Sequence, residues 1–227
     1  MNSICFDTSG PTGCVCLVRD GRIAGSITLS KVYGHNETLL PSISLLLEQS
    51  GQSVRDLTDV AFVRGPGSFT GLRIGAAVAY GLSEAVPGLR ISGYTSLYLL
   101  NRAVQDNTSG PLISVIDARK KQVYLGAFQA GHPLAPYGVF DPGEVRHVLE
   151  RLGVRNETLS MVGSGAVVYR EQLQDQYPDA VFLDAPTCLA ESLAVEMIDP
   201  AGGETASDEL LYIRKSDAEL HRDSKRG

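Results

Sequence analysis

Two aspartates stand where a carboxylate could hold a metal–phosphate group. Asp7 follows the apolar run of residues 3–6 and precedes the turn-rich TSGPTG, and Asp117 follows the apolar run of residues 112–116. A carboxylate at the end of a strand can ligate a cation that carries a phosphate, or it can cap a turn through its own hydrogen bonds. Both interpretations stay open at this stage, and the metal–phosphate site could be active or vestigial.

A second candidate for phosphate chemistry is the glycine-rich stretch RGPGSFTGLRIG, residues 64–75. Glycine-rich turns that open a helix often bind phosphate with backbone N–H groups. Here, however, the spacing Gly65-x-Gly67-x-x-x-Gly71 is one residue too long for the dinucleotide fingerprint, and no Gly-Lys-Ser/Thr follows as in a P-loop. Direct phosphate binding is therefore disfavoured.

A strand-to-helix turn explains the start of this stretch better. Pro66 fixes its own φ, Gly65 or Gly67 takes a conformation closed to other residues, and Ser68 or Thr70 caps the helix. This interpretation does not account for the glycines further into the helix.

Gly71 and Gly75 fall inside the expected helix, where each costs roughly 1 kcal/mol relative to alanine. With Ala79 and Ser83 they form a stripe of small residues four apart, which lets another backbone come very close. The partner could belong to the same chain or to another one. Because Phe69 is expected at the exposed start of the same helix, we interpret the stripe as part of a protein interface.

Residues typical of a catalytic centre are scarce. The four histidines, His35, His132, His147 and His221, form no pair at metal-ligand spacing, and no Gly-x-Ser-x-Gly nucleophile turn is present. We therefore predict no catalytic residue, no metal site and no cofactor.

The elements that position these residues form an α/β pattern that occurs twice. Strands are expected at residues 3–6, 14–18, 23–29 and 59–63, and helices at 36–50, 70–86 and 95–104. The breaker-rich residues 105–111 mark a boundary, after which residues 112–128 repeat the opening strand, turn and strand. The sequence thus predicts subdomains at 1–105 and 111–214, the second less regular, and a charged tail at 215–227.

Composition places the chain among ordinary globular proteins. The 227 residues are 43% hydrophobic with a net charge of −6, and no apolar run is long enough to span a bilayer. No signal peptide is visible, so we expect a cytoplasmic location. The acidic balance gives no overall attraction to nucleic acid. Cys5, Cys14, Cys16 and Cys188 are expected to be buried free thiols.

Five segments resemble the TsaB family, also called YeaZ: residues 64–75, FDTS at 6–9, LLPSI at 39–43, IDARKKQVY at 116–124 and YIR at 212–214. The resemblance implies an actin/hexokinase-like (ASKHA) fold made of two ribonuclease H-like units. It also implies a role in making threonylcarbamoyladenosine beside the anticodon of tRNAs that read codons beginning with A. In that family TsaB is a non-catalytic subunit.

Partners follow from the same resemblance. TsaB proteins pair with the paralogous transferase TsaD, the ATPase TsaE joins them, tRNA binds only through the complex, and isolated TsaB forms homodimers. TsaD-like proteins carry two metal-binding histidines where this sequence has Ser96 and Leu100. The expected interface consists of Leu39, Leu40, Ile43, Leu47, Pro66, Gly67, Ser68, Phe69, Thr70, Gly71, Arg73 and Gly75.

Two other functions compete with this one. A small actin/hexokinase-like phosphotransferase or ATPase would use Asp7 and Asp117, and would have to bind nucleotide as an isolated chain. A protease would need a nucleophile, a base and an orienting group, and the sequence shows no such grouping.

Overall fold

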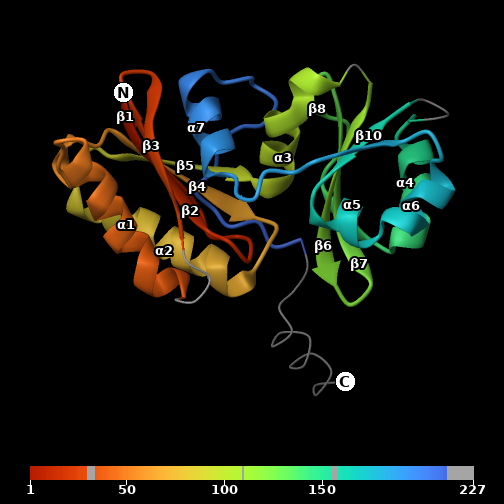
Figure 1. The fold of residues 1–227 in the computed structure, drawn as a ribbon, viewed down its shortest axis with the longest axis horizontal. Helices are drawn as coiled ribbons and strands as arrows, with labels where there is room; N and C mark the ends of the chain where they lie inside the picture. The colour runs from red at the N-terminus through yellow and green to blue at the C-terminus, as the bar shows by residue number, and fades with distance from the viewer. Residues whose placement is uncertain (30–33, 109, 155–157, 214–227) are drawn as a thin grey trace.

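The chain folds around two β-sheets that share one strand order (Figure 1). The structure is a computed structural model that describes residues 1–29, 34–108, 110–154 and 158–213. The first sheet has the order β3-β2-β1-β4-β5, with β1 (Asn2–Asp7), β2 (Cys14–Arg19), β3 (Arg22–Thr28), β4 (Asp59–Gly65) and β5 (Arg90–Thr95).

Strand direction in the first sheet follows from the connections. β1, β2 and β3 are antiparallel neighbours, whereas β4 and β5 run parallel to β1 and are reached through helices. The tight turn from β2 to β3 is made by Asp20 and Gly21, whose φ angles of 50° and 74° are those of the turn that Asp-Gly favours. The predicted opening hairpin is confirmed.

The second sheet repeats this plan. Its order is β11-β10-β6-β7-β8, with β9 also paired to β7, and β6 and β7 are antiparallel while β6, β10 and β11 are parallel. Its strands are β6 (Leu112–Arg119), β7 (Gln122–Gln129), β8 (His132–Pro133), β9 (Gly138–Phe140), β10 (Ser160–Val162) and β11 (Val181–Leu183). Since several of these strands have only two or three residues, the second copy is the less regular one, as predicted.

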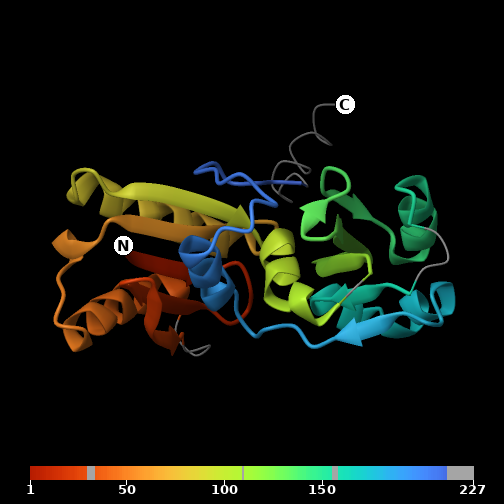
Figure 2. The same cartoon turned by 90° about the horizontal axis from the view of Figure 1, so that it is seen from above.

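Helices separate and cover the two sheets. α1 (His35–Gln49) and α2 (Phe69–Ala85) cover one face of the first sheet, and α3 (Ser96–Val104) and α7 (Ala190–Ile198) lie between the sheets (Figures 1 and 2). The outer face of the second sheet is covered by α4 (Val145–Arg151), α5 (Ser164–Val168) and α6 (Arg170–Gln176). Apolar side chains form two outer cores and a central one, and the central region also buries polar groups such as Asp7 and Glu196.

The end of the chain returns to the first sheet. α7 packs against β1, β2 and β4, and the segment after it runs along the β5 side of that sheet (Figure 2). Backbone hydrogen bonds fix this segment, from Ser207 N to Gly93 O at 3.0 Å and from Leu211 N to Arg64 O at 2.8 Å. The sequence assigned residues 190–213 to the second subdomain, but in the structure they pack against the first sheet. The predicted tail at 215–227 lies outside the described residues.

Candidate functional site

The glycine-rich stretch forms the strand-to-helix turn that its sequence predicts. β4 ends at Gly65, whose φ of 117° is open to glycine alone, and α2 begins at Phe69. The Ser68 hydroxyl accepts a hydrogen bond from Gly71 N at 3.3 Å and so caps the helix. Ser68 N in turn donates to Ser9 O at 2.7 Å, which ties the turn to the loop after β1.

The stripe of small residues on α2 packs inside the chain. A Cβ on Gly71 would collide with the carbonyl oxygen of Thr8, and one on Gly75 would lie 2.7 Å from the Thr8 hydroxyl oxygen. Ala79 is fully buried as well. The interface interpretation of Gly71 and Gly75 is therefore wrong, because the close partner of the stripe is the loop after β1 of the same chain. Gly67 is similar, since its Cβ would lie 2.6 Å from Ser9 O.

Phe69 has partners within the chain that the sequence did not reveal. Its ring centroid lies 4.9 Å from that of Tyr212 in the returning C-terminal segment, and the guanidinium carbon of Arg73 lies 3.9 Å from the Phe69 centroid. Phe69 is therefore half-buried rather than a freely exposed anchor.

On α1, only one of the four expected interface residues is exposed. Leu39, Ile43 and Leu47 are buried against the first sheet, whereas Leu40 is 48% exposed. The helix presents one face to the sheet, so residues at that spacing serve the core of this chain. Pro66 is also buried, and its carbonyl oxygen accepts a hydrogen bond of 2.5 Å from the Ser96 hydroxyl.

An exposed surface nevertheless remains across the two helices, which lie side by side in Figure 1. We call it the outer helical face and define it by Leu40 and Leu45 of α1 and by Thr70, Arg73 and Ala77 of α2, all exposed. Leu45, 45% exposed, was missed in the sequence because it stands next to Leu46 and Leu47 in one apolar run. Its helical phase, opposite to Leu39 and Ile43, is the signal that could have identified it.

Asp7 and Asp117 occupy equivalent places and both cap a turn. Asp7 Oδ1 accepts hydrogen bonds from Ser9 N at 2.8 Å and from the Ser9 hydroxyl at 2.6 Å. Asp117 Oδ1 accepts one from Arg119 N at 2.9 Å. In each copy the carboxylate thus binds the N–H two residues further on, which is the turn-capping arrangement.

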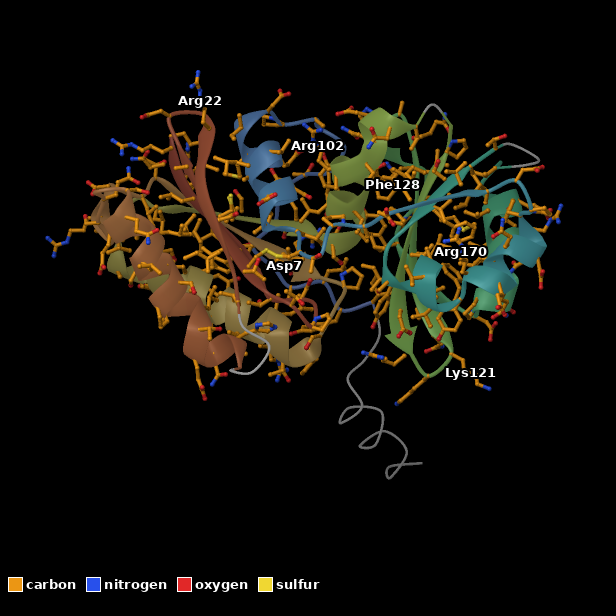
Figure 3. All side chains as sticks on the ribbon, viewed as in Figure 1. Asp7, Arg22, Arg102, Lys121, Phe128 and Arg170 are labelled. Carbon is orange, nitrogen blue, oxygen red and sulfur yellow. A yellow bond between two sulfur atoms is a disulfide. The ribbon has the colours of Figure 1, made fainter. Side chains whose placement is uncertain are left out.

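Asp7 also connects β1 to the segment that leads into α7. Asp7, labelled in Figure 3, is 2% exposed, and its Oδ2 accepts a hydrogen bond of 3.0 Å from the backbone N–H of Leu189, directly before α7. Burial raises the pKa of Asp7, while the hydrogen bonds from Ser9 and Leu189 and the nearby His35 lower it to a smaller extent. Within the described ranges, no three His, Cys, Asp or Glu side chains are arranged as metal ligands would be.

The cysteines differ from the expectation of four free thiols. Cys14 of β2 and Cys188, just before α7, form a disulfide across 174 residues, and Cys5 and Cys16 are free and buried. Sequence separation concealed this pair, because only the return of α7 to the first sheet brings Cys188 to β2.

In the part of the chain that the structure describes, no helix has the length and apolar character of a membrane span.

Two copies of one sheet order, each with an antiparallel second strand and with helices between and outside the sheets, define a duplicated ribonuclease H-like fold of the actin/hexokinase (ASKHA) class. Two solved structures from Pseudomonas aeruginosa share the fold. One, "YeaZ", has a TM-score of 0.73 at 27% identity and is matched over 99% of its chain and 93% of this one. The other is described as similar to peptidase YEAZ and has a TM-score of 0.74 at 26% identity, over 99% of its chain and 94% of this one.

Sequence comparisons agree with the structural ones. The chain is 33% identical over 129 residues to the tRNA threonylcarbamoyladenosine biosynthesis protein TsaB of Escherichia coli, which is 57% of this chain and 55% of that protein. It is 27% identical over 176 residues to the Bacillus subtilis protein of the same name, 77% of this chain and 76% of that one. The family model described as TsaD, tRNA N6-adenosine threonylcarbamoyltransferase, matches residues 28–138. The alignment thus spans about half the length of the Escherichia coli relative. The chain belongs to the TsaB (YeaZ) family.

Proposed function

We propose that this chain is a non-catalytic subunit in the formation of threonylcarbamoyladenosine in tRNA, beside the anticodon of tRNAs that read codons beginning with A. The names of its relatives support the pathway. In this role it pairs with a TsaD-type transferase, TsaE joins the pair, and tRNA is bound only through the complex. The observation that carries the proposal is the outer helical face, an exposed and partly apolar surface on two neighbouring helices.

The size of this face suits a stable pair. α1 has 15 residues and α2 has 17, so at 1.5 Å per residue they are about 22 and 25 Å long. Two helices of this length can supply the roughly 800 Å² per partner of a standard interface. Leu40 and Leu45 provide apolar contact area, and Arg73 and Thr70 provide a polar rim.

The same surface suits both a paralogue and a second copy. The family model described as TsaD spans residues 28–138, which include α1 and α2. A partner built on the same helix pair can therefore dock by approximate two-fold symmetry, and two copies of this chain can do so by exact symmetry. We therefore expect the homodimer and the heterodimer to exclude each other.

The phosphotransferase or ATPase alternative has less support. It would use Asp7, but the carboxylate of Asp7 already accepts three hydrogen bonds from Ser9 and Leu189. Calorimetry with ATP at millimolar concentration tests this alternative directly, since an enzyme of this kind must bind the nucleotide as an isolated chain.

Gly81 offers a sharp test of the pairing surface. It is exposed on α2, one helical turn after Ala77, and a Cβ built on it meets nothing within 4 Å. Gly81→Arg should therefore keep the fold while placing a large cation on the outer face. Val181→Glu, which changes an exposed residue of β11 in the second sheet, is the matched control.

The measurement is the light-scattering mass of each variant alone and mixed with the TsaD-type paralogue of the same genome. We expect wild type and Val181→Glu to give a species with one copy of each protein, and Gly81→Arg and Ala77→Glu to pair at least tenfold more weakly. Two unmixed peaks with wild type, or full pairing by both face variants, would contradict the proposal.

A further inference from the structure

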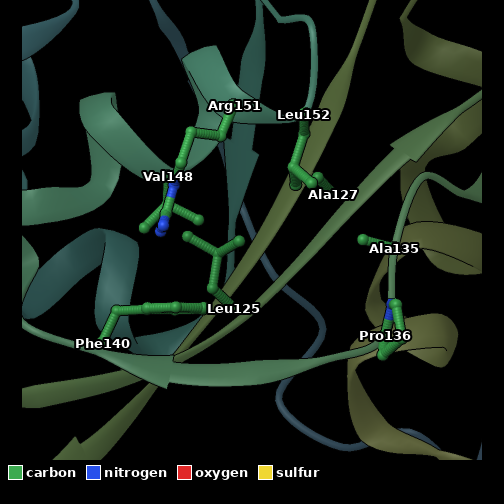
Figure 4. A pocket seen from close by; sticks show the side chains of 8 residues that line it. All are labelled: Leu125, Ala127, Ala135, Pro136, Phe140, Val148, Arg151 and Leu152. Atoms are coloured by element: carbon green, nitrogen blue, oxygen red, sulfur yellow. The ribbon is translucent and has the colours of Figure 1, made fainter.

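The outer face of the second sheet contains an apolar pocket beside α4 (Figure 4). Its volume is about 300 Å³. Leu125 and Ala127 of β7 and Phe140 of β9 line it, together with Pro136 from the loop between β8 and β9 and Val148 and Arg151 of α4. This pocket lies on the opposite side of the second sheet from α3 and α7, so it is separate from the outer helical face of α1 and α2.

The duplication explains why the pocket exists. In the first copy the helix after the third strand is α1, with 15 residues, and in the second copy the corresponding helix is α4, with seven. α1 is therefore about 22 Å long and α4 only about 10 Å. α1 reaches the far end of β2, where Arg19 Nη1 donates a hydrogen bond of 3.0 Å to Ser50 O.

In the first copy the corresponding helix packs closely on the sheet. A Cβ on Gly25 of β3 would lie only 3.2 Å from Cδ2 of Leu46, so α1 packs tightly on the strands beneath it. α4 ends at Arg151, at the edge of the pocket. The pocket therefore lies at the C-terminal end of α4, on the sheet face that corresponds to the one the longer α1 covers in the first copy.

The pocket has one charge and otherwise apolar walls. Arg151 is exposed, and among the residues that the structure describes it forms no ion pair, whereas its neighbour Glu150 pairs with Arg146. Figure 4 shows the guanidinium end of Arg151 on the side of the pocket where Leu125, Phe140 and Val148 lie. The remaining lining residues are uncharged. An arginine has a planar pair of donors that fits a carboxylate.

We infer that this pocket binds a short alkyl chain that ends in a carboxylate. The chain lies against Leu125, Phe140 and Val148, and the carboxylate accepts hydrogen bonds from Arg151. The volume is at the lower end of the range for ligand pockets, which limits the ligand to about four to eight carbons.

Two sources offer this chemistry, a free short-chain acid and the C-terminal leucine of a peptide. Hexanoate represents the first and N-acetylleucine the second. Hexylamine and hexanol have an alkyl chain but no carboxylate. Their affinity therefore measures binding by the apolar walls alone, without the contact to Arg151.

The experiment is a titration of each compound into the full chain, followed by calorimetry and by two-dimensional NMR. We expect saturable binding of hexanoate or N-acetylleucine, and binding of hexylamine and hexanol at least tenfold weaker. Arg151→Gln should weaken carboxylate binding at least tenfold, and Ala135→Leu, which fills the pocket from a half-exposed loop, should abolish it. Arg22→Gln, at an exposed position on β3, should change nothing.

Preference for one of the two carboxylates identifies the source. If neither hexanoate nor N-acetylleucine binds saturably at concentrations up to about 10 mM, the inference is overturned. Equal affinity for hexylamine, or unchanged affinity in both pocket variants with normal melting curves, would overturn it as well.

Discussion

The hydroxyl of Thr8 donates a hydrogen bond of 2.8 Å to the carbonyl oxygen of Gly71, and the Thr8 carbonyl oxygen occupies the place that a side chain on Gly71 would need. The loop after β1 therefore rests directly on the backbone of α2. The glycines of the stripe permit this approach, so the loop that follows Asp7 and contains Ser9 lies directly against the helix.

Replacing Gly71 should consequently damage the fold itself. Gly71→Ala overpacks a contact with rigid backbone, so we expect the free energy of unfolding to fall by about 1–3 kcal/mol in urea denaturation. Gly81→Ala is the matched control on the same helix, where a Cβ meets nothing within 4 Å, and it should stabilise the protein by up to about 1 kcal/mol. Equal free energies of unfolding for the two variants would show that the loop after β1 moves aside at little cost, which would contradict the prediction.

The free thiols should be unreactive in the native protein. Burial raises the pKa of Cys16 to about 12, and burial raises the pKa of Cys5 well above its usual value. A thiol reagent at pH 8 should therefore detect no free thiol in the native protein. After denaturation it should detect two thiols, those of Cys5 and Cys16, and after denaturation with reduction it should detect all four. Four thiols in the unreduced denatured protein would exclude the disulfide.

The Cys14–Cys188 disulfide should contribute to stability. It closes a loop of 174 residues and fixes the start of α7 to β2, so its loss should cost about 2–4 kcal/mol. We expect dithiothreitol to lower the melting temperature of wild type, and to leave that of the Cys14→Ser/Cys188→Ser double variant unchanged. A wild type whose melting temperature does not respond to reductant would contradict this.

The contribution of Asp7 to the free energy of unfolding should become less favourable as pH rises. Because burial raises its pKa in the folded state above 3.8, the folded protein holds this proton more tightly than the unfolded chain does. The stabilising contribution is thus complete below pH 3.8 and is lost as pH rises through the folded pKa. We expect the stability of wild type relative to Asp7→Asn, from urea midpoints, to fall between pH 3.5 and neutral pH. A rise over that interval would mean that the hydrogen bonds from Ser9 and Leu189 outweigh burial.

Glu204 should be the main attachment of the returning C-terminal segment. Its carboxylate accepts hydrogen bonds from Arg64 at 2.9 Å, from the Thr95 hydroxyl at 2.7 Å and from Thr95 N at 3.2 Å. Glu204→Ala leaves the largely buried Arg64 without this carboxylate, so we expect a loss of about 3–5 kcal/mol. Hydrogen exchange of residues 200–213 should accelerate more than that of β1, and uniform protection in the variant would refute the assignment.

Local patterns in the sequence identified most of the fold. The Asp20-Gly21 turn, the strand before Gly65 and the repeated strand-to-aspartate start at Asp7 and Asp117 each depend on neighbouring residues. Such features are set by backbone preference and by hydrophobic period, which a single sequence displays. The expected helix limits at 36–50 and 70–86 agree with α1 and α2 to within a residue.

The candidate site could be predicted only in part. Gly71, Leu39 and Ile43 carry the same small or apolar pattern whether they meet another protein or their own sheet, so pattern alone could not assign them. Phe69 with Tyr212, and Cys14 with Cys188, are joined only because the end of the chain returns to the first sheet. Contacts of this kind depend on tertiary topology, which local periodicity does not encode.

The return of α7 to the first sheet also sets the order in which the protein can mature on a ribosome. The inner face of that sheet, with Cys5, Val18 and Val63, is covered by a helix that ends at Ile198. At about 5–20 residues per second, roughly ten seconds pass between synthesis of β4 and of α7. Throughout that interval the nascent chain carries an apolar sheet face that α7 does not yet cover, so we expect the growing polypeptide, rather than the finished protein, to be the form that requires a chaperone.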